Sequence, residues 1–432
     1  IKVVGDGLGL RETKGRAYTQ LLEQEITSTI KRRVEGRGIA DIEAHASPVT
    51  PLQTVYFGGG TPSLLPVDCV ESILNTLRST VGMDDKCEVT LEMDPGTFDE
   101  AKLHALKAIG ITRVSLGVQS FDPSVLTACG RAHTAAESHG ALTMATAVFD
   151  VLTLTLTLTL TLTSALTLTL TLIRTTTLKD VSVDLISSLP HLTKDLWEET
   201  LHIAASSTCS HLSIYDLQVE RGTAFGKWYQ PGIFPLPSER ESADMYRTAH
   251  EVLSAHGFEH YEVSNYARMK SGVGVRGTEG GSGAIGKSYR STHNQKYWAC
   301  DAVYGFGVGA TSFVDGERAV RPRGFVEYTA YVNNGCLGED LTEEKYGIGC
   351  SVQHEPDVLE VIMLSLRTSD GLNLNRLGQR YGQDLRDAIE RALLPFLDSG
   401  HAKIHADIAA LTVPDGFLVS NDVISSIFAE LP

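Results

Sequence analysis

Four polar residues lie near the ends of apolar, β-branched segments of the sequence, and their side chains could bind a ligand. They are Glu92, Gln119, Asp184 and Gln218. The carboxyl ends of parallel strands meet at one rim of a barrel, so side chains at successive strand ends face a common cavity. Carboxylates and amides form hydrogen bonds with hydroxyl and ammonium groups. The pattern predicts a site for a polar small molecule.

A glycine platform accompanies these residues. The first predicted strand ends in Gly58–Gly60, which Thr61 and Pro62 follow. Glycines leave backbone N–H and C=O groups bare beside a ligand. Alternatively, each polar residue only forms a turn or caps a helix, where Asp, Thr and Gly are common. The succession of these residues at strand ends favours the ligand site.

The sequence shows no pattern of a catalytic nucleophile or a metal centre. Its 14 histidines are scattered, and neither Gly-x-Ser-x-Gly nor His-Glu-x-x-His occurs. We therefore predict no catalytic residue and no metal ligand from these motifs.

Alternating strands and helices would position the polar residues. The predicted strands are Thr54–Gly60, Glu88–Pro95, Arg113–Phe121, Val181–Pro190, His211–Glu220 and Tyr261–Tyr266. Helical patterns lie near residues 66–80, 99–109, 123–148, 194–206 and 238–256. This alternation predicts right-handed βαβ units and an α/β fold with a parallel sheet. A helix over Tyr18–Arg33 would follow a first strand that is missing from the sequence.

The C-terminal region follows a different pattern. Three amphipathic helices are predicted, and two short strand-like runs come after them. The helices are Asp357–Thr368, Leu374–Tyr381 and Leu385–Ser399, and the runs are His401–His405 and Gly416–Ser420. Helices followed by a β wing predict a small winged-helix-like domain. Because it lacks the basic face that DNA binding requires, we expect a packing or lid role.

Composition excludes several classes of protein. The 432 residues are 42% hydrophobic, enough for a core, and the net charge of −16 argues against nucleic-acid and anionic-membrane partners. Seven cysteines, the closest pair 14 residues apart, form no disulfide or CxxC pattern. These features predict a reducing compartment. The chain begins with Ile1 and shows no signal peptide, so we interpret it as a processed product or a fragment.

Two segments interrupt the strand–helix pattern. From Leu152 to Leu172 the chain alternates Leu and Thr, and one strand of that length would span roughly 70 Å. Its period of two does not fit a membrane-spanning helix, and we interpret it as translated repeat DNA and an aggregation hazard. The second segment, Ser271–Lys287, is rich in glycine and predicts a flexible loop without a phosphate-binding motif.

Six ordered motifs resemble one known family. They are VYFGGGTPSLL (55–65), VTLEMDPGTF (89–98), ITRVSLGVQSFD (111–122), VSVDLISSLP (181–190), HLSIYDLQVERGT (211–223) and HNQKYW (293–298). They resemble radical S-adenosylmethionine (SAM) proteins of the oxygen-independent coproporphyrinogen III oxidase group, and most of all its HemW-type heme chaperones. The resemblance implies a partial (β/α)6 TIM-like barrel, here without its first strand.

The resemblance also implies a division of the chain. A radical SAM core would occupy residues 1–268, with the Leu-Thr insert at 151–173. The glycine-rich insert would span 269–290, and a connecting region with the HNQKYW motif would span 291–354. A C-terminal helical domain of the coproporphyrinogen oxidase type would occupy 355–432.

Site residues carry over from the resembling motifs. Gly59, Gly60 and Thr61 would contact the methionine part of S-adenosylmethionine. The same cofactor would be lined by Glu92, Gln119, Arg131 and Asp184, and by Gln218 with weaker identity. His293 would be a heme contact, with Tyr297 and Trp298 lining the macrocycle, because histidine ligates heme iron and aromatic rings stack on porphyrin. The alternative is a histidine that caps a turn beside core aromatics.

The family binds a [4Fe–4S] cluster through Cys-x3-Cys-x2-Cys, and that spacing is absent here. By the resemblance the three cysteines would fall just before Ile1, so we expect the cluster only in an intact protein. Without the cluster, S-adenosylmethionine is not reductively cleaved, and the chain as written would be inactive in that chemistry.

The leading hypothesis is a heme chaperone that transfers heme to acceptor proteins. The alternatives are a coproporphyrinogen III dehydrogenase of porphyrin biosynthesis and a ligand-binding remnant without a cluster. We expect a cytoplasmic or organellar location, in a mitochondrion or plastid. No nucleic-acid partner is expected, and membrane association would come only through a recipient protein.

Overall fold

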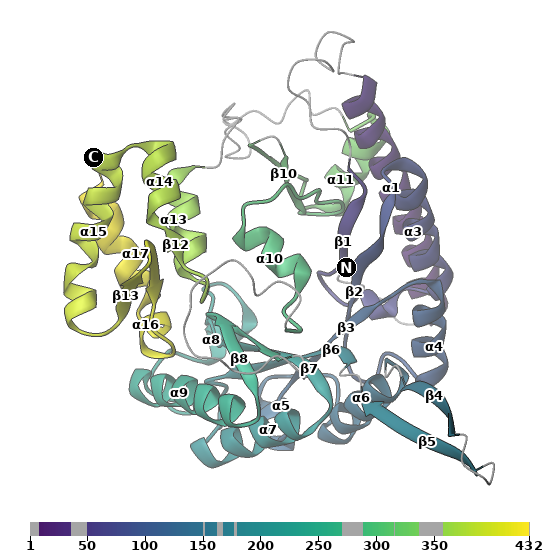
Figure 1. Cartoon of the computed structure of the whole chain (residues 1–432). Helices are drawn as coiled ribbons and strands as arrows, with labels where there is room; N and C mark the ends of the chain where they lie inside the picture. Colours follow the sequence, from purple (N-terminus) through teal and green to yellow (C-terminus); the bar gives the residue numbers. More distant parts are fainter. Residues whose placement is uncertain are drawn as a thin grey trace.

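A seven-stranded sheet, curled into half a barrel, forms the centre of the protein (Figure 1). This computed structural model describes residues 8–35, 50–149, 152–161, 167–176, 179–269, 288–314, 316–336 and 357–431. Residues 270–287 of the glycine-rich insert, and Cys350, lie outside the described residues.

The strand order is β1-β2-β3-β6-β7-β9-β8. Its first five strands run parallel, as predicted, and they are β1 (Leu52–Phe57), β2 (Met83–Met93), β3 (Arg113–Gln119), β6 (Lys179–Ser187) and β7 (Cys209–Asp216). Because consecutive strands are neighbours, their carboxyl ends lie along one rim in chain order. The rim therefore gathers the ends of β1, β2, β3 and β6, where most of the predicted site residues lie.

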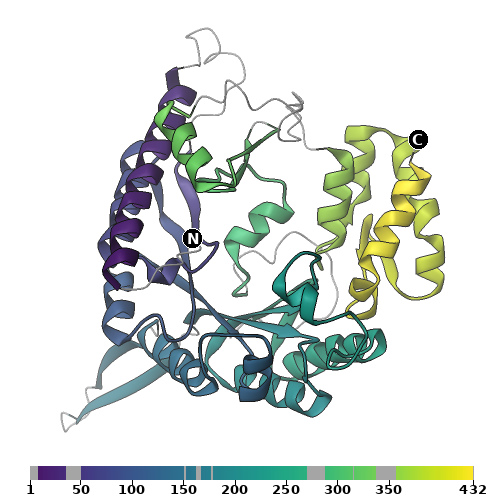
Figure 2. The same cartoon turned by 180° about the vertical axis from the view of Figure 1, so that it is seen from behind.

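Helices cover the convex face of the sheet (Figures 1 and 2). They are α1 (Leu8–Glu35), α3 (Val67–Thr80), α4 (Glu100–Ile109), α6 (Ala135–Val148), α7 (Lys194–Ser206) and α9 (Glu239–Ala255). Apolar positions three and four residues apart put one face of each helix against the strands. Leu74, Leu103 and Trp197 are fully buried there against Leu91 and Val183 of the sheet. This core fixes the strands, and thereby their ends.

Two predicted elements are each divided in the structure. The single strand expected at Tyr261–Tyr266 is an antiparallel hairpin of β8 (Phe258–Glu262) and β9 (Asn265–Arg268). The helix expected over 123–148 is α5 (Pro123–Ala128) followed by α6. Gly130 adopts φ +65° after α5, and the Thr134 side chain caps α6 in a capping box with Glu137. The left-handed glycine ends the first helix, and the new N-cap starts the second.

The Leu-Thr segment contains two strands, not one strand of roughly 70 Å. β4 (Leu152–Thr161) and β5 (Thr167–Thr176) pair in antiparallel register, with Leu160 opposite Leu168. The hairpin projects away from the main sheet (Figure 1). A single extended strand would leave both of its backbone edges unpaired, whereas folding back satisfies one of them.

The C-terminal region contains α13 (Val358–Leu366), α14 (Leu374–Tyr381), α15 (Gln383–Asp398), α16 (Asp415–Leu418) and α17 (Ser420–Glu430). Its three-stranded sheet has the order β12-β14-β13, with β12 Leu372–Asn373, β14 Ile408–Leu411 and β13 Ala402–His405. The strand expected at Gly416–Ser420 is wrong, because that stretch is largely helical. Ala406 and Asp407 adopt positive φ and form a two-residue turn directly after β13. The strand that pairs with β13 is therefore Ile408–Leu411, which comes earlier in the chain than predicted.

Backbone hydrogen bonds join this region to the last strand of the main sheet. The Val263 N–H donates to the Arg367 carbonyl at 3.1 Å, and the Ser369 N–H donates to the Tyr261 carbonyl at 2.9 Å. Arg290 adds charged contacts, with Nη1 2.9 Å from the Asp370 carboxylate and Nε 3.1 Å from that of Glu259. Residues 367–370 therefore cover the outer edge of the sheet at the C-terminal end of β8.

A buried carboxylate holds α1 against the segment that carries β10 (Thr311–Val314), β11 (Glu317–Val320) and α11 (Phe325–Asn333). Glu25 is fully buried and accepts hydrogen bonds from Arg321 Nε at 2.8 Å, Tyr328 Oη at 2.7 Å and the Gly307 N–H at 2.9 Å. These four groups fix the loop 301–310 beside β1. Among the described residues, no helix combines the length and apolar composition needed to cross a membrane.

Candidate functional site

Glu92, at the end of β2, links two parts of the sheet rim. Its Oε1 accepts a hydrogen bond from the Tyr56 hydroxyl at 3.0 Å, and its Oε2 accepts one from the Gly59 N–H at 3.0 Å. A Cβ at Gly58 would lie 2.8 Å from the Tyr56 ring and 3.1 Å from Glu92, so only glycine fits there. Gly59 and Gly60 are exposed at positive φ. The platform predicted from the sequence is thus in contact with Glu92.

Asp94 brings together two predicted residues that do not touch each other. Its carboxylate accepts a hydrogen bond from Thr61 Oγ1 at 3.0 Å and pairs with Arg131 Nη2 at 3.2 Å. Asp94 and Glu92 are two residues apart at the end of β2, so their side chains lie on the same face. Gly117 keeps space for this carboxylate, because a Cβ there would lie 2.8 Å from Asp94 Oδ1.

Two buried polar atoms on this rim have no partner within the described part of the chain. They are Gln119 Oε1 and Arg131 Nε. Gln119 also adopts φ +62°, a conformation that non-glycine residues rarely take outside functional sites. Buried polar atoms without partners are rare in folded proteins and are commonly satisfied by a ligand or water.

Asp184 lies on β6, with both carboxylate oxygens 3.0 Å from Ser115 Oγ. Burial raises the pKa of Asp184 to about 6, while hydrogen bonds from Ser213 and Ser115 oppose the rise and the charge of Glu92 adds to it. The charge of Glu92 therefore acts on Asp184 across the concave face. Gln218 lies apart, exposed beyond the end of β7.

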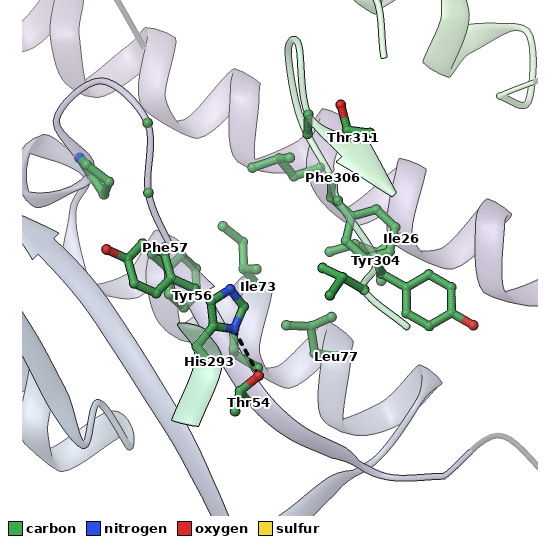
Figure 3. A pocket seen from close by; sticks show the side chains of 18 of the residues that line it. Ile26, Thr54, Tyr56, Phe57, Ile73, Leu77, His293, Tyr304, Phe306 and Thr311 are labelled. Carbon is green, nitrogen blue, oxygen red and sulfur yellow. Dashed lines mark hydrogen bonds between the residues drawn. The ribbon is translucent and has the colours of Figure 1, made fainter. Parts of the chain in front are cut away.

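His293 occupies the first turn of α10 (Thr292–Trp298), on the concave side of β1. Glu88 positions it, accepting hydrogen bonds from the N–H groups of Thr292 at 3.2 Å and His293 at 3.0 Å. The His293 Nδ1 lies 2.9 Å from Thr54 Oγ1 (Figure 3). The imidazole stacks on the Tyr56 ring with centroids 5.0 Å apart. Burial lowers the pKa of His293, which favours the neutral imidazole.

A cavity of about 1370 Å³ opens beside His293 (Figure 3). It runs along β1 and is lined by His293, Tyr297, the Gly58–Gly60 platform and apolar side chains from α1, α3 and the loop 301–310. Those apolar side chains include Ile26, Ile73, Leu77, Tyr304 and Phe306. Trp298, expected beside Tyr297, is not among the lining residues, and its buried Nε1 has no partner within the described residues.

Sequence reasoning overlooked Tyr56, Thr54 and Asp94. Asp94 carried a signal, because it stands two residues after Glu92 at the same strand end. Thr54 and Tyr56 carried a weaker signal. They are two residues apart, and therefore on the same face, in the strand that leads into the glycine platform. Their contacts with His293 join residues more than 230 positions apart, which no local pattern reveals.

The rim residues suit S-adenosylmethionine, whose ammonium, carboxylate and ribose hydroxyl groups need acceptors, donors and bare backbone. The orphaned Gln119 Oε1 and the exposed glycine platform both fit such a ligand. The described residues do not offer ligands for a [4Fe–4S] cluster in the same way. The described residues contain no cluster of three or more Cys, His, Asp or Glu side chains placed to hold a metal.

Comparison with known sequences decides the family. The Radical SAM superfamily profile matches residues 36–164, and the HemN C-terminal domain profile matches residues 352–418. A protein of Synechocystis sp. named "Heme chaperone HemW" is 33% identical over 401 residues, which cover 88% of this chain and 84% of that protein. The chain belongs to the HemW family of radical SAM proteins.

Other HemW-family relatives extend the likeness. The heme chaperone HemW of Bacillus subtilis is 27% identical, with 96% of this chain and 92% of the relative covered. A mouse relative, radical S-adenosyl methionine domain-containing protein 1, mitochondrial, is 33% identical over 61% of this chain and 49% of its own length. The family implies S-adenosylmethionine and a [4Fe–4S] cluster as cofactors.

The fold also matches a solved structure. Coproporphyrinogen III oxidase (HemN) from Escherichia coli superposes with a TM-score of 0.68 over 99% of this chain and 85% of that one. The two sequences are 18% identical, so the likeness establishes the fold of this HemW-family chain.

Proposed function

We propose that this protein is a heme chaperone, which binds heme beside His293 and transfers it to acceptor proteins. The observation that carries the proposal is the position of His293, in the wall of a large, mostly apolar cavity. Heme is a large apolar macrocycle whose iron takes histidine as an axial ligand. Relatives named heme chaperones, at identities of up to 33%, support the same function.

The contacts of His293 suit an iron ligand. A ligating histidine usually donates its other ring N–H to a fixed acceptor, which sets the tautomer and the ring orientation. Here Nδ1–H would donate to Thr54 Oγ1 at 2.9 Å, leaving the Nε2 lone pair for iron. Tyr297, with its ring edge-on to His293 at 5.2 Å, would contact the macrocycle.

For the cofactor, the proposal assigns the residues of the rim. Gly59, Gly60 and Thr61 would hold the methionine part of S-adenosylmethionine. Ribose and ammonium groups would meet polar side chains of the neighbouring strands, namely Glu92, Gln119, Arg131 and Asp184. Gln218 would join them only if the segment after β7 moved inward, because it lies exposed.

The coproporphyrinogen oxidase alternative has less support, since the solved oxidase shares 18% identity and indicates the fold alone. The six described cysteines form no disulfide, which fits a reducing compartment in the cytosol or an organelle. The acceptors of the heme would be apoproteins, and a membrane would be reached only through them.

Replacing His293 with alanine is expected to weaken heme binding by at least about tenfold, because the axial nitrogen is lost. The measurement is a titration of the full chain with heme, followed by absorbance in the Soret region. His104→Ala is the matched control, since His104 is an exposed histidine on the outer helix α4. A His293→Ala variant that binds heme like the His104→Ala variant would contradict the role of His293.

A further inference from the structure

One side chain touches both the cofactor rim and the proposed heme site. Tyr56 donates its hydroxyl to Glu92 Oε1 at 3.0 Å, and its ring stacks on His293 at 5.0 Å with 22° between the planes. Figure 3 shows Tyr56 beside His293, and both residues line the cavity. The distance between the two proposed sites is thus spanned by a single residue.

We propose that Tyr56 couples the two sites, so that S-adenosylmethionine bound at Glu92 weakens the hold of His293 on heme. This inference rests on the proposed function, and it adds a regulation that the separate sites do not supply. Tyr56 acts here as a positioning residue, through Glu92 on one side and through His293 on the other.

The coupling follows from competition at one carboxylate. Both oxygens of Glu92 are already engaged, Oε1 by Tyr56 and Oε2 by the Gly59 N–H. A carboxylate offers about four lone-pair sites, so ribose hydroxyls that donate to Glu92 share its negative charge with these two donors, weaken their hydrogen bonds and draw the carboxylate away from Tyr56. Burial and the charges of Glu92 and Asp184 raise the pKa of Tyr56, so its hydroxyl stays protonated and keeps needing an acceptor.

Packing passes a displacement of Tyr56 on to His293. The backbone at Gly58 closes one side of the ring, since a Cβ there would lie 2.8 Å from it. His293 lies on the ring face, and its own backbone is fixed by Glu88. When Tyr56 leaves Glu92, the imidazole therefore loses the surface that orients it, while its helix stays in place.

Thermodynamic linkage makes the effect reciprocal. If the cofactor lowers heme affinity by some factor, heme lowers cofactor affinity by the same factor. A coupling carried by one hydrogen bond corresponds to a change of about fivefold.

The test is a heme titration of the full chain, with and without S-adenosylmethionine at a concentration that saturates its own binding isotherm. Wild type is expected to show a heme Kd about fivefold higher with the cofactor, accompanied by a shifted Soret band. Tyr56→Phe keeps the stacked ring and loses the hydroxyl, so its Kd ratio should fall within about twofold of one. Tyr331→Phe is the control, because Tyr331 packs on Tyr328 of α11 and is not among the residues that line the cavity, so this variant should keep the wild-type ratio.

Several outcomes would overturn the coupling. These are a Tyr56→Phe variant with the wild-type ratio, a wild-type ratio near one, or a flat cofactor isotherm. The heme site itself is tested separately: an unchanged heme affinity of the His293→Ala variant would contradict the proposed function. A His293→Ala variant that loses heme, together with a Tyr56→Phe variant that keeps the cofactor effect, would sustain the heme site and reject the coupling.

Discussion

Replacing Glu25 with alanine should lower the free energy of unfolding by about 3–5 kcal/mol. The carboxylate is fully buried, and its removal leaves the Arg321 guanidinium, which is also buried, without its counter-charge. The Tyr328 hydroxyl and the Gly307 N–H lose their acceptor in the same step. Urea denaturation followed by far-UV circular dichroism measures the loss.

A matched control shows how much of the expected loss of stability is due to the burial of the ion pair. Asp68→Ala breaks an ion pair with Arg16 whose side chains are 58% and 47% exposed. Exposed pairs contribute about 0–1 kcal/mol, so that variant should remain close to wild type. If Glu25→Ala lost no more stability than Asp68→Ala, the network at Glu25 would not be what holds α1 to the loop 301–310.

Replacing Asp184 with asparagine should stabilise the protein at neutral pH. Burial raises the Asp184 pKa from 3.8 to about 6 in the folded state. At pH values between these two pKa values, the folded protein binds the Asp184 proton more tightly than the unfolded chain does. The free energy of unfolding of wild type therefore falls as the pH rises, by about 3 kcal/mol in all. The amide of the Asp184→Asn variant does not titrate, and the advantage of the variant should grow from near zero at pH 4 to that size above pH 7.

Thermal melts of both proteins at pH 4.5 and pH 7.5 measure the difference. Asp122→Asn is the control: burial opposes the change, but hydrogen bonds from Ser124 and Val125 lower the Asp122 pKa below its ordinary value. A lowered carboxyl pKa changes stability only below about pH 4, so the difference between this variant and wild type should stay nearly constant from pH 4.5 to pH 7.5. Parallel pH profiles for Asp184→Asn and wild type would refute the raised pKa. A charged group that destabilises the fold in this way is typical of a binding site.

Much of the parallel sheet was predictable, because its signal is local. Largely apolar runs such as Val114–Val118 define buried strands, and amphipathic helices lie between them. The expectation failed where pairing depends on turns: β8 and β9 separate at the turn between Glu262 and Asn265, and the Ala406–Asp407 turn moves the last C-terminal strand to Ile408–Leu411.

The candidate site was predictable for residues at strand ends and not for those that connect them. Glu92 follows from its position at the end of β2, whereas Asp184, predicted at a strand end, lies inside β6. Asp94 could have been found from its position two residues after Glu92, whereas the importance of Tyr56 lies in its contacts with Glu92 and His293. The fully buried Glu25 was likewise invisible, since its position in α1 resembles that of any helix glutamate until Arg321 is brought to it.

The covering of β8 by residues 367–370 has a consequence for how copies of the chain behave together. A half-barrel has two terminal strands, and an open strand edge is a template for pairing with the edge of another molecule. At the C-terminal end of β8 that template is removed, because the Tyr261 carbonyl and the Val263 N–H already bond within the chain. The C-terminal region thus protects this part of the sheet edge against edge-to-edge aggregation.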